Sequence, residues 1–143
     1  MALRIIPQIH RATHRVGLHI ARLGGTSVTQ AEAHVLAYLD EAGPSTIADV
    51  HRAFAHKRST LTSILDRLQG RGLIVRTSDA RDRRTFVISL TARGRTVAGR
   101  VARHLEAFEA RVLASASPSD LRTFVRVLNA MDRALDERAS GSR

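Results

Sequence analysis

The segment from Gly72 to Arg95, GLIVRTSDARDRRTFVISLTARGR, constrains the fold of this chain most strongly. Two β-rich runs, Leu73–Val75 and Phe86–Ile88, flank a loop of arginines and aspartates that cannot be buried together. The pattern predicts a basic β-hairpin directly behind a helix. Three arginines on one solvent-exposed loop indicate a polyanionic partner.

The composition narrows the nature of this partner. The chain has 143 residues, enough for one domain, and its 23 Lys+Arg against 13 Asp+Glu give a formal net charge of +10. Such a balance is typical of proteins that bind nucleic acids, although membranes and acidic proteins also attract it. Aromatic residues make up only 3% of the chain, which disfavours the stacking platforms that bind single strands. Duplex DNA is therefore the favoured partner.

Several protein classes are disfavoured by what the sequence lacks. No run approaches the roughly 18 apolar residues that a membrane span requires, and the N-terminal residues lack the apolar core of a signal peptide, so we expect a cytoplasmic protein. The absence of cysteine excludes disulfides and thiolate metal sites. There is no sequence motif for a nucleophile with its base, and no glycine-rich phosphate loop after a strand. We therefore expect neither an enzyme nor a cofactor.

Apolar periodicity and capping residues predict six helices. Thr29 and Glu32 form a capping box, while Thr91 and Ser117 are expected N-caps. The final helix is expected to bury an apolar stripe and to end in a frayed polar tail at 137–143. The expected helices span 3–23, from the Thr29 cap to a stop at Gly43-Pro44, from Ser45 or Thr46 to about 54, 58–70, 91–114, and from Pro118 onward. The final stripe is formed by Leu121, Phe124, Val125, Leu128, Met131 and Leu135.

The two short helices before the hairpin match a helix-turn-helix, which makes the hairpin its wing. The helix at 58–70 places Leu61, Ile64, Leu65 and Leu68 on one stripe and small hydroxyl residues on the opposite side. Small hydroxyl side chains permit close approach to the floor of a DNA groove and still form hydrogen bonds with base edges. A solvated helix face is the structural alternative.

These residues resemble the MarR family of winged helix-turn-helix transcriptional regulators. The resemblance is carried by STLT at 59–62, LDRL at 65–68, RGLIVR at 71–76, DARDRR at 79–84 and LTARGR at 90–95. It implies a mainly α fold with a small β-hairpin wing and long terminal dimerisation helices. It also implies a homodimer with two winged lobes that face DNA. The single domain, 1–143, would comprise dimerisation helices at 1–28 and 114–143, a winged helix-turn-helix at 29–95 and a connecting helix at 91–114.

Eight side chains are expected to contact DNA. They are Arg58, Ser59, Thr60, Ser63 and Arg67 on the helix and Arg81, Arg83 and Arg84 on the wing. The hydroxyl residues are expected in the major groove, and Arg58 and Arg67 on bases or phosphates. Ser63 occupies a position where the family often has arginine, and Ala80 one where proline is common. The first departure shifts part of the base reading to Arg58 or Arg67.

Within the wing, the resemblance makes Arg84 the first candidate for insertion into a narrow minor groove, with Arg83 second. Acidic side chains beside DNA repel phosphate, so Asp82 is expected to orient Arg84. The structural alternative is a solvated loop with local Asp–Arg pairs, which contribute little to stability.

An effector site and a metal site are weaker hypotheses. Small anionic or phenolic effectors of the family bind between the dimer helices and the winged lobe, where His14, Arg15, His34 and Tyr38 of the first two helices are candidates. His10 and His14 lie four residues apart, and zinc would require further ligands such as His34 or His104. We expect no metal, because histidines that line the dimer interface or a ligand cleft explain the pattern equally well.

The sequence thus predicts a dimeric repressor of transcription that binds a pseudo-palindromic DNA operator and is released by a small molecule. The alternative is an architectural DNA-binding protein of low sequence specificity, which the high net charge also permits.

Overall fold

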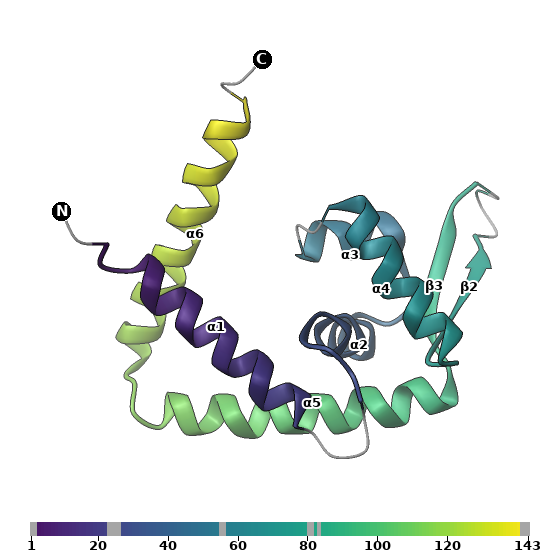
Figure 1. The fold of residues 1–143 in the computed structure, drawn as a ribbon, viewed down its shortest axis with the longest axis horizontal. Helices are drawn as coiled ribbons and strands as arrows, with labels where there is room; N and C mark the ends of the chain where they lie inside the picture. The colour runs from purple at the N-terminus through teal and green to yellow at the C-terminus, as the bar shows by residue number, and fades with distance from the viewer. Residues whose placement is uncertain (1–2, 23–26, 55–56, 80–81, 83, 141–143) are drawn as a thin grey trace. The chain divides into compact units, whose positions relative to one another are not determined.

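The computed structural model describes residues 3–22, 27–54, 57–79, 82 and 84–140. The chain divides into two compact units, Met1–Arg103 and His104–Arg143, with the boundary inside one long helix. Figure 1 shows helices α1 (Ile6–Ala21), α2 (Gln30–Ala42), α3 (Ile47–Phe54), α4 (Arg58–Gly70), α5 (Ala92–Leu113) and α6 (Pro118–Ser140), and strands β1 (Ser45–Thr46), β2 (Ile74–Ser78) and β3 (Phe86–Leu90).

The mainly helical fold with a small hairpin confirms the predicted class, but the sheet has a third strand. Its order is β1-β3-β2, and both pairings are antiparallel. Ser45 pairs with Ile88 and Thr46 with Val87, so the helix expected to open at Ser45 or Thr46 begins at Ile47 instead. A strand of two residues has no periodicity to detect, and its partner lies more than 40 positions along the chain.

The core of the first unit lies between α2, α4 and the sheet. The stripe predicted for the helix at 58–70 is confirmed, because Leu61, Ile64, Leu65 and Leu68 are all at most 2% exposed. Ile88 of the central strand is fully buried. This packing holds the opposite face of α4 in solvent, beside the wing formed by β2, β3 and the loop between them (Figure 1).

Side-chain caps fix where the helices begin. The predicted capping box is present: the Glu32 N–H donates to the Thr29 hydroxyl at 3.3 Å, and the Thr29 N–H donates to Glu32 Oε2 at 3.1 Å. The Thr91 hydroxyl accepts from the Gly94 N–H at 2.9 Å and lies 2.7 Å from the Gly72 carbonyl oxygen, to which it donates. The Thr91 hydroxyl therefore joins the start of α5 to the residue that follows the C-cap of α4.

The second unit exposes the apolar stripe that the sequence predicted to be buried. Within the single chain, Leu121 is 40% exposed, Phe124 57%, Val125 45% and Leu135 65%. The helical pattern is correct, whereas the expected burial is wrong for the isolated chain. The expected tail is also corrected, since α6 continues through residues 137–140. None of the helices in the described parts of the chain is both long and apolar enough to span a membrane.

Candidate nucleic-acid interface

The exposed face of α4 presents a row of hydroxyl groups. Ser59, Thr60 and Ser63 are all exposed, as their predicted role requires. The Ser63 hydroxyl donates to the Ser59 carbonyl at 3.1 Å, and the Thr62 hydroxyl donates to the Arg58 carbonyl at 2.9 Å. The protons of these two hydroxyl groups are thus held by the preceding helical turn, while their oxygen lone pairs remain able to accept hydrogen bonds from outside the helix.

A groove of about 600 Å³ lies between α3, the start of α4 and the end of the wing. Its lining includes Arg52 of α3, Arg58 of α4 and Arg84 of the wing, with Ile47 and Phe86 among the apolar residues. Arg58 and Arg84 are exposed and make no ion pair within the described part of the chain. The fold therefore brings two predicted DNA contacts, 26 positions apart, to one cationic groove.

The wing turn is shaped by Asp82 in a way that differs from the expectation. Its Oδ1 accepts from the main-chain N–H of Arg84 at 2.9 Å, and its Oδ2 accepts from the Thr85 hydroxyl at 3.0 Å. The carboxylate contacts Arg84 through the backbone, and no contact with the guanidinium occurs among the described residues. Asp82 therefore closes the turn that carries Arg84. Arg81 and Arg83 lie outside the described residues.

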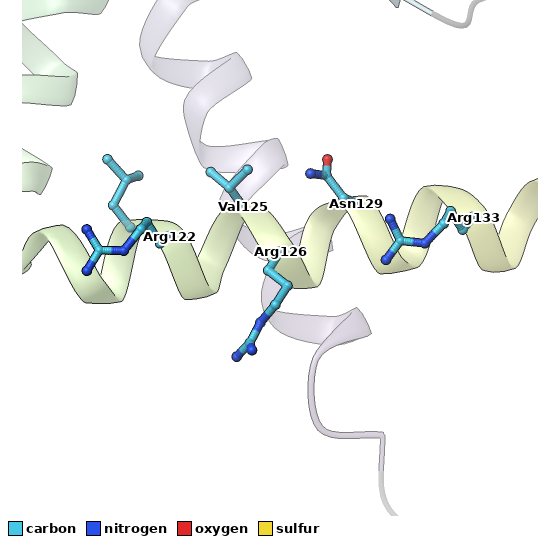
Figure 2. Close-up of a pocket in the computed structure, with 6 residues that line it drawn as sticks. Arg122, Val125, Arg126, Asn129 and Arg133 are labelled. Carbon is cyan, nitrogen blue, oxygen red and sulfur yellow. The ribbon is translucent and has the colours of Figure 1, made fainter.

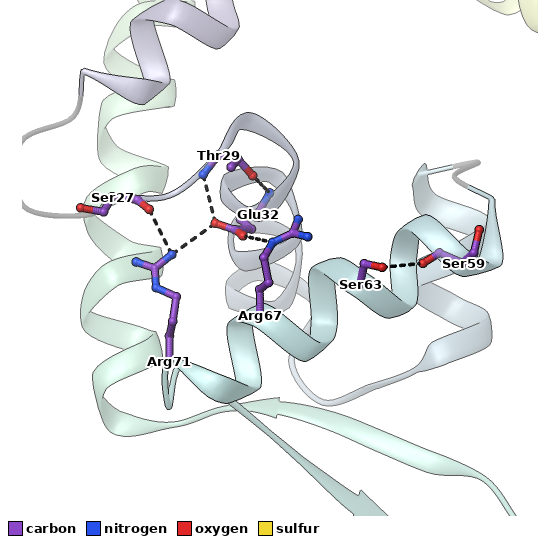
Figure 3. Close-up of polar contacts among 7 residues, drawn as sticks. All are labelled: Ser27, Thr29, Glu32, Ser59, Ser63, Arg67 and Arg71. Carbon is purple, nitrogen blue, oxygen red and sulfur yellow. Dashed lines mark hydrogen bonds and ion pairs between the residues drawn. The ribbon is translucent and has the colours of Figure 1, made fainter.

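Arg67 is held by an ion pair that the sequence did not reveal. Its Nε donates to Glu32 Oε1 at 2.8 Å, and Arg71 Nη1 donates to Glu32 Oε2 at 3.2 Å (Figure 3). Glu32 is 3% exposed. The sequence showed no sign of this ion pair for two reasons. The capping box already accounted for an acidic residue at position 32, and the arginines that pair with Glu32 lie more than 30 positions further along the chain. The guanidinium of Arg67, which was expected to contact DNA, is thus directed toward Glu32 on α2.

A second ion pair joins α4 to the wing. Arg76 Nη2 of β2 lies 2.7 Å from Asp66 Oδ1, one position before Arg67 on α4. The hairpin and the helix are therefore linked by a directional contact as well as by apolar packing. No sequence spacing rule predicts this pair, because one partner belongs to a helix and the other to a strand.

The start of α3, at one edge of the groove, is fixed by Thr46 and Asp49. Asp49 Oδ2 accepts from the Thr46 hydroxyl at 2.7 Å and from its main-chain N–H at 3.0 Å. These two hydrogen bonds, with a smaller contribution from Arg52, hold the pKa of Asp49 below its ordinary value. The Asp49 carboxylate stays ionised and pairs with Arg52, which places that guanidinium beside the groove.

The four predicted effector residues lie on α1 and α2. His14 and Arg15 are exposed, whereas His34 and Tyr38 are half-buried. The Tyr38 ring packs edge-on against Phe54, with 5.6 Å between the ring centroids. These residues line neither the groove beside α4 nor a second groove, which is formed by α6 and described below. In the described ranges no three His, Cys, Asp or Glu side chains gather in a metal-binding arrangement.

Helix α6 carries a second groove, of about 350 Å³, within the C-terminal unit. Arg122, Val125, Arg126, Asn129 and Arg133 are among its lining residues (Figure 2). Arginines alternate here with the exposed apolar residues of the same helix. This surface therefore combines an unpartnered apolar stripe with a row of cations.

Comparison with known proteins places these features in context. A model of the MarR family matches residues 18–85 of this chain. Over 67 residues the chain is 37% identical to the HTH-type transcriptional repressor MdtR of Bacillus subtilis (strain 168), a match that covers 47% of this chain and 43% of MdtR. The matched part therefore spans less than half of that curated relative.

Three solved structures have the same fold over most of this chain. A probable transcriptional regulator from Pseudomonas aeruginosa is 26% identical, with a TM-score of 0.74 over 90% of this chain and 96% of that one. The MepR–DNA complex of S. aureus is 22% identical, with a TM-score of 0.80 and coverages of 94% and 99%. BpsR of Bordetella bronchiseptica, whose DNA binding is regulated by 6-hydroxynicotinic acid, is 23% identical, with a TM-score of 0.69 and coverages of 90% and 99%.

Proposed function

Since a model of the MarR family matches residues 18–85 of this chain, we propose that it is a member of this family that binds double-stranded DNA in a sequence-specific manner and regulates transcription. The observation that carries the proposal is the groove that joins Arg58 to Arg84 beside the exposed hydroxyl row of α4. Hydroxyl side chains on a helix are suited to reading base edges in the major groove. Arginines on either side are suited to phosphate and to a narrow minor groove. The net charge of +10 adds long-range attraction to DNA.

The proposed DNA contacts are the residues expected from the sequence, but the structure supports some of them more strongly than others. Ser59, Thr60 and Ser63 would read bases, while Arg58 and Arg84 would hold the backbone and the minor groove. Arg81 and Arg83 remain proposed contacts on the strength of their position in the wing loop. Arg67 is the weakest of the set, because its guanidinium is paired with Glu32.

We propose that the functional form is a homodimer. The apolar stripe of α6 is exposed in the single chain, and an exposed stripe of this kind is typical of an interaction surface. A two-fold axis would present two copies of α4 to successive major grooves about 34 to 36 Å apart. The operator would then be a pseudo-palindrome. Such a protein would act in the cytoplasm, where bacterial DNA lies.

Repression released by a small molecule is the form of regulation that we propose. MdtR is a repressor, and BpsR responds to 6-hydroxynicotinic acid, an aromatic acid. In this chain His14, Arg15, His34 and Tyr38 offer cationic and hydrogen-bonding groups suited to a small anionic or phenolic ligand. An effector that prefers a dimer with misplaced lobes would shift the population away from DNA.

Selection of bound fragments from a random pool of duplex DNA tests the proposal. The full chain should enrich an inverted repeat and bind it more than about 10³-fold more tightly than a scrambled duplex of the same length. An architectural protein would bind both duplexes alike and enrich no sequence. That second outcome would replace the proposed regulator with a coating or bending protein.

A further inference from the structure

The buried carboxylate of Glu32 connects α2 to the far end of the DNA-facing helix. It accepts hydrogen bonds from the Thr29 N–H at 3.1 Å, from Arg67 Nε at 2.8 Å and from Arg71 Nη1 at 3.2 Å (Figure 3). Arg71 Nη1 also donates to the Ser27 carbonyl at 3.1 Å, which ties in the segment before α2. Capping α2 requires only the first of these contacts. The other two come from the last turn of α4 and its C-cap.

Arg67 lies on the same stripe of α4 as the hydroxyl row. Ser59, Ser63 and Arg67 follow one another at intervals of four residues, so their side chains leave the helix on the same side. In Figure 3 the contact between Ser59 and Ser63 lies nearer the start of this helix, and the contact of Arg67 with Glu32 lies nearer its end. An anchor at Arg67 therefore fixes the direction in which the proposed base-reading residues point.

Apolar packing alone fixes the rotation of α4 about its axis less strictly than hydrogen bonds do. The buried face of α4 is formed by Leu61, Ile64, Leu65 and Leu68, and the hydrophobic effect that holds it is not directional. Hydrogen bonds between charged groups depend on angle as well as distance. Among the described residues, two such contacts involve α4 itself: Arg67 donates to Glu32, and Arg76 of β2 donates to Asp66.

We infer that Glu32 is a positioning residue for DNA recognition: it sets the rotation of α4 about its own axis and so determines how well this protein distinguishes one DNA sequence from another. The inference rests on the proposed function. Loss of the carboxylate should reduce sequence discrimination more than general affinity for DNA. It should even favour general binding, because the Arg67 guanidinium would lose the carboxylate that pairs with it and become available to phosphate.

The test compares Glu32→Gln with Thr29→Ala in the full chain. The first substitution keeps the size of the side chain but removes the charge that holds two arginines. The second removes the capping hydroxyl and leaves the Glu32 contacts with both arginines in place. The probes are the duplex enriched from the random pool by the unsubstituted chain and a scrambled duplex of equal length.

For Glu32→Gln we expect the ratio of the two affinities to fall about tenfold or more, with equal or tighter binding to the scrambled duplex. Thr29→Ala should leave this ratio within about twofold, even where both variants have a lower Tm. An unchanged ratio in a folded Glu32→Gln variant would overturn the inference and leave the proposed function intact. If the unsubstituted chain enriches no sequence, the proposed function fails, and the inference falls with it.

Arg67→Gln provides a second variant in case Glu32→Gln does not fold. Glu32 then keeps its contacts with Arg71 and the Thr29 N–H. If Arg67 acts through Glu32, this variant lowers the affinity ratio with little change in the dependence of affinity on salt. A direct phosphate contact would instead lower both affinities equally and reduce the salt slope by about 1. That result would overturn the positioning role.

Discussion

Gly94, in the first turn of α5, lies directly against the main chain of Leu73. A Cβ placed on Gly94 would lie 1.8 Å from the Leu73 carbonyl oxygen and 2.8 Å from its carbonyl carbon. The same carbonyl oxygen accepts from the Thr91 N–H at 3.1 Å. Helix α5 thus begins in contact with the segment that leads from α4 into the wing, and only glycine permits this approach.

Gly94→Ala should therefore destabilise the first unit. The added methyl group meets backbone, which cannot rotate away, so α5 or the start of β2 must shift. We expect a loss of about 1–3 kcal/mol or more in the free energy of unfolding, measured by urea denaturation followed by circular dichroism. Gly70→Ala is the matched control, because a Cβ there has no neighbour within 4 Å among the described residues. Alanine in that helical position should be neutral or stabilise by up to about 1 kcal/mol. Equal effects of the two substitutions would contradict the close approach.

Arg84→Ala should weaken DNA binding by at least about tenfold and leave the protein folded. Arg84 is exposed, lies in the cationic groove and has no acidic partner in the described part of the chain, so its loss should remove the proposed DNA contact without breaking an ion pair within the protein. Fluorescence anisotropy at several salt concentrations gives the affinity and a salt slope that should fall by about 1. Arg111→Ala makes the same charge change at an exposed residue that does not line the groove. Unchanged affinity and slope in Arg84→Ala would show that the wing does not contact DNA through this residue.

Phe124→Asp should convert a dimer into monomers, because it places a charge in the exposed apolar stripe of α6. Sedimentation equilibrium would report the mass. Affinity for the selected duplex should fall by about 10² or more, because two half-sites would no longer be bound together. Arg111→Gln lowers the net charge equally and is the control, because Arg111 is an exposed residue of α5 and not of the α6 stripe. A Phe124→Asp protein that remains dimeric would assign the interface to another surface.

Ser117→Ala should raise the pKa of Asp120. The Ser117 hydroxyl at 2.7 Å and its main-chain N–H at 2.8 Å hold the pKa of this carboxyl below its ordinary value. Because the folded pKa lies below the unfolded one, the stabilisation is present above the unfolded pKa and is lost as pH falls through the folded pKa. Carbon-13 NMR titration of the carboxyl groups would measure the change. The pKa of Asp49 should stay low in the same spectra, and an unchanged pKa of Asp120 would assign its shift to another cause.

The elements that could be predicted are those with local signals. The helix at 58–70 was predicted from apolar spacing and has those bounds in the structure, and the Thr29–Glu32 capping box follows from a spacing of three. The missed features depend on distant partners. β1 exists only because Ser45 and Thr46 pair with β3, and the role of Glu32 depends on arginines at the end of α4.

For the candidate site, the sequence predicted which residues take part but not how they are arranged. Residue types and the hairpin placed Arg58 and Arg84 among the expected contacts, but only the fold shows that they line one groove. For Asp82 the predicted partner was Arg84, and the sequence could not distinguish its guanidinium from its main-chain N–H. The burial expected for the α6 stripe could not be judged from one chain, since amphipathic spacing does not specify whether the covering surface belongs to the same molecule.

The anchoring of the hairpin at its base has a consequence for how the wing can vary. The Thr91 hydroxyl holds Gly72, before β2, to the start of α5, and β3 leads directly into Thr91. At the distal end of the hairpin the Asp79 N–H donates to the Thr85 carbonyl at 2.8 Å. Length changes at the base would displace α5, whereas the tip is bounded by its own hydrogen bond. We therefore expect that loops of different length and charge grafted between Asp79 and Thr85 change the wing without displacing α5.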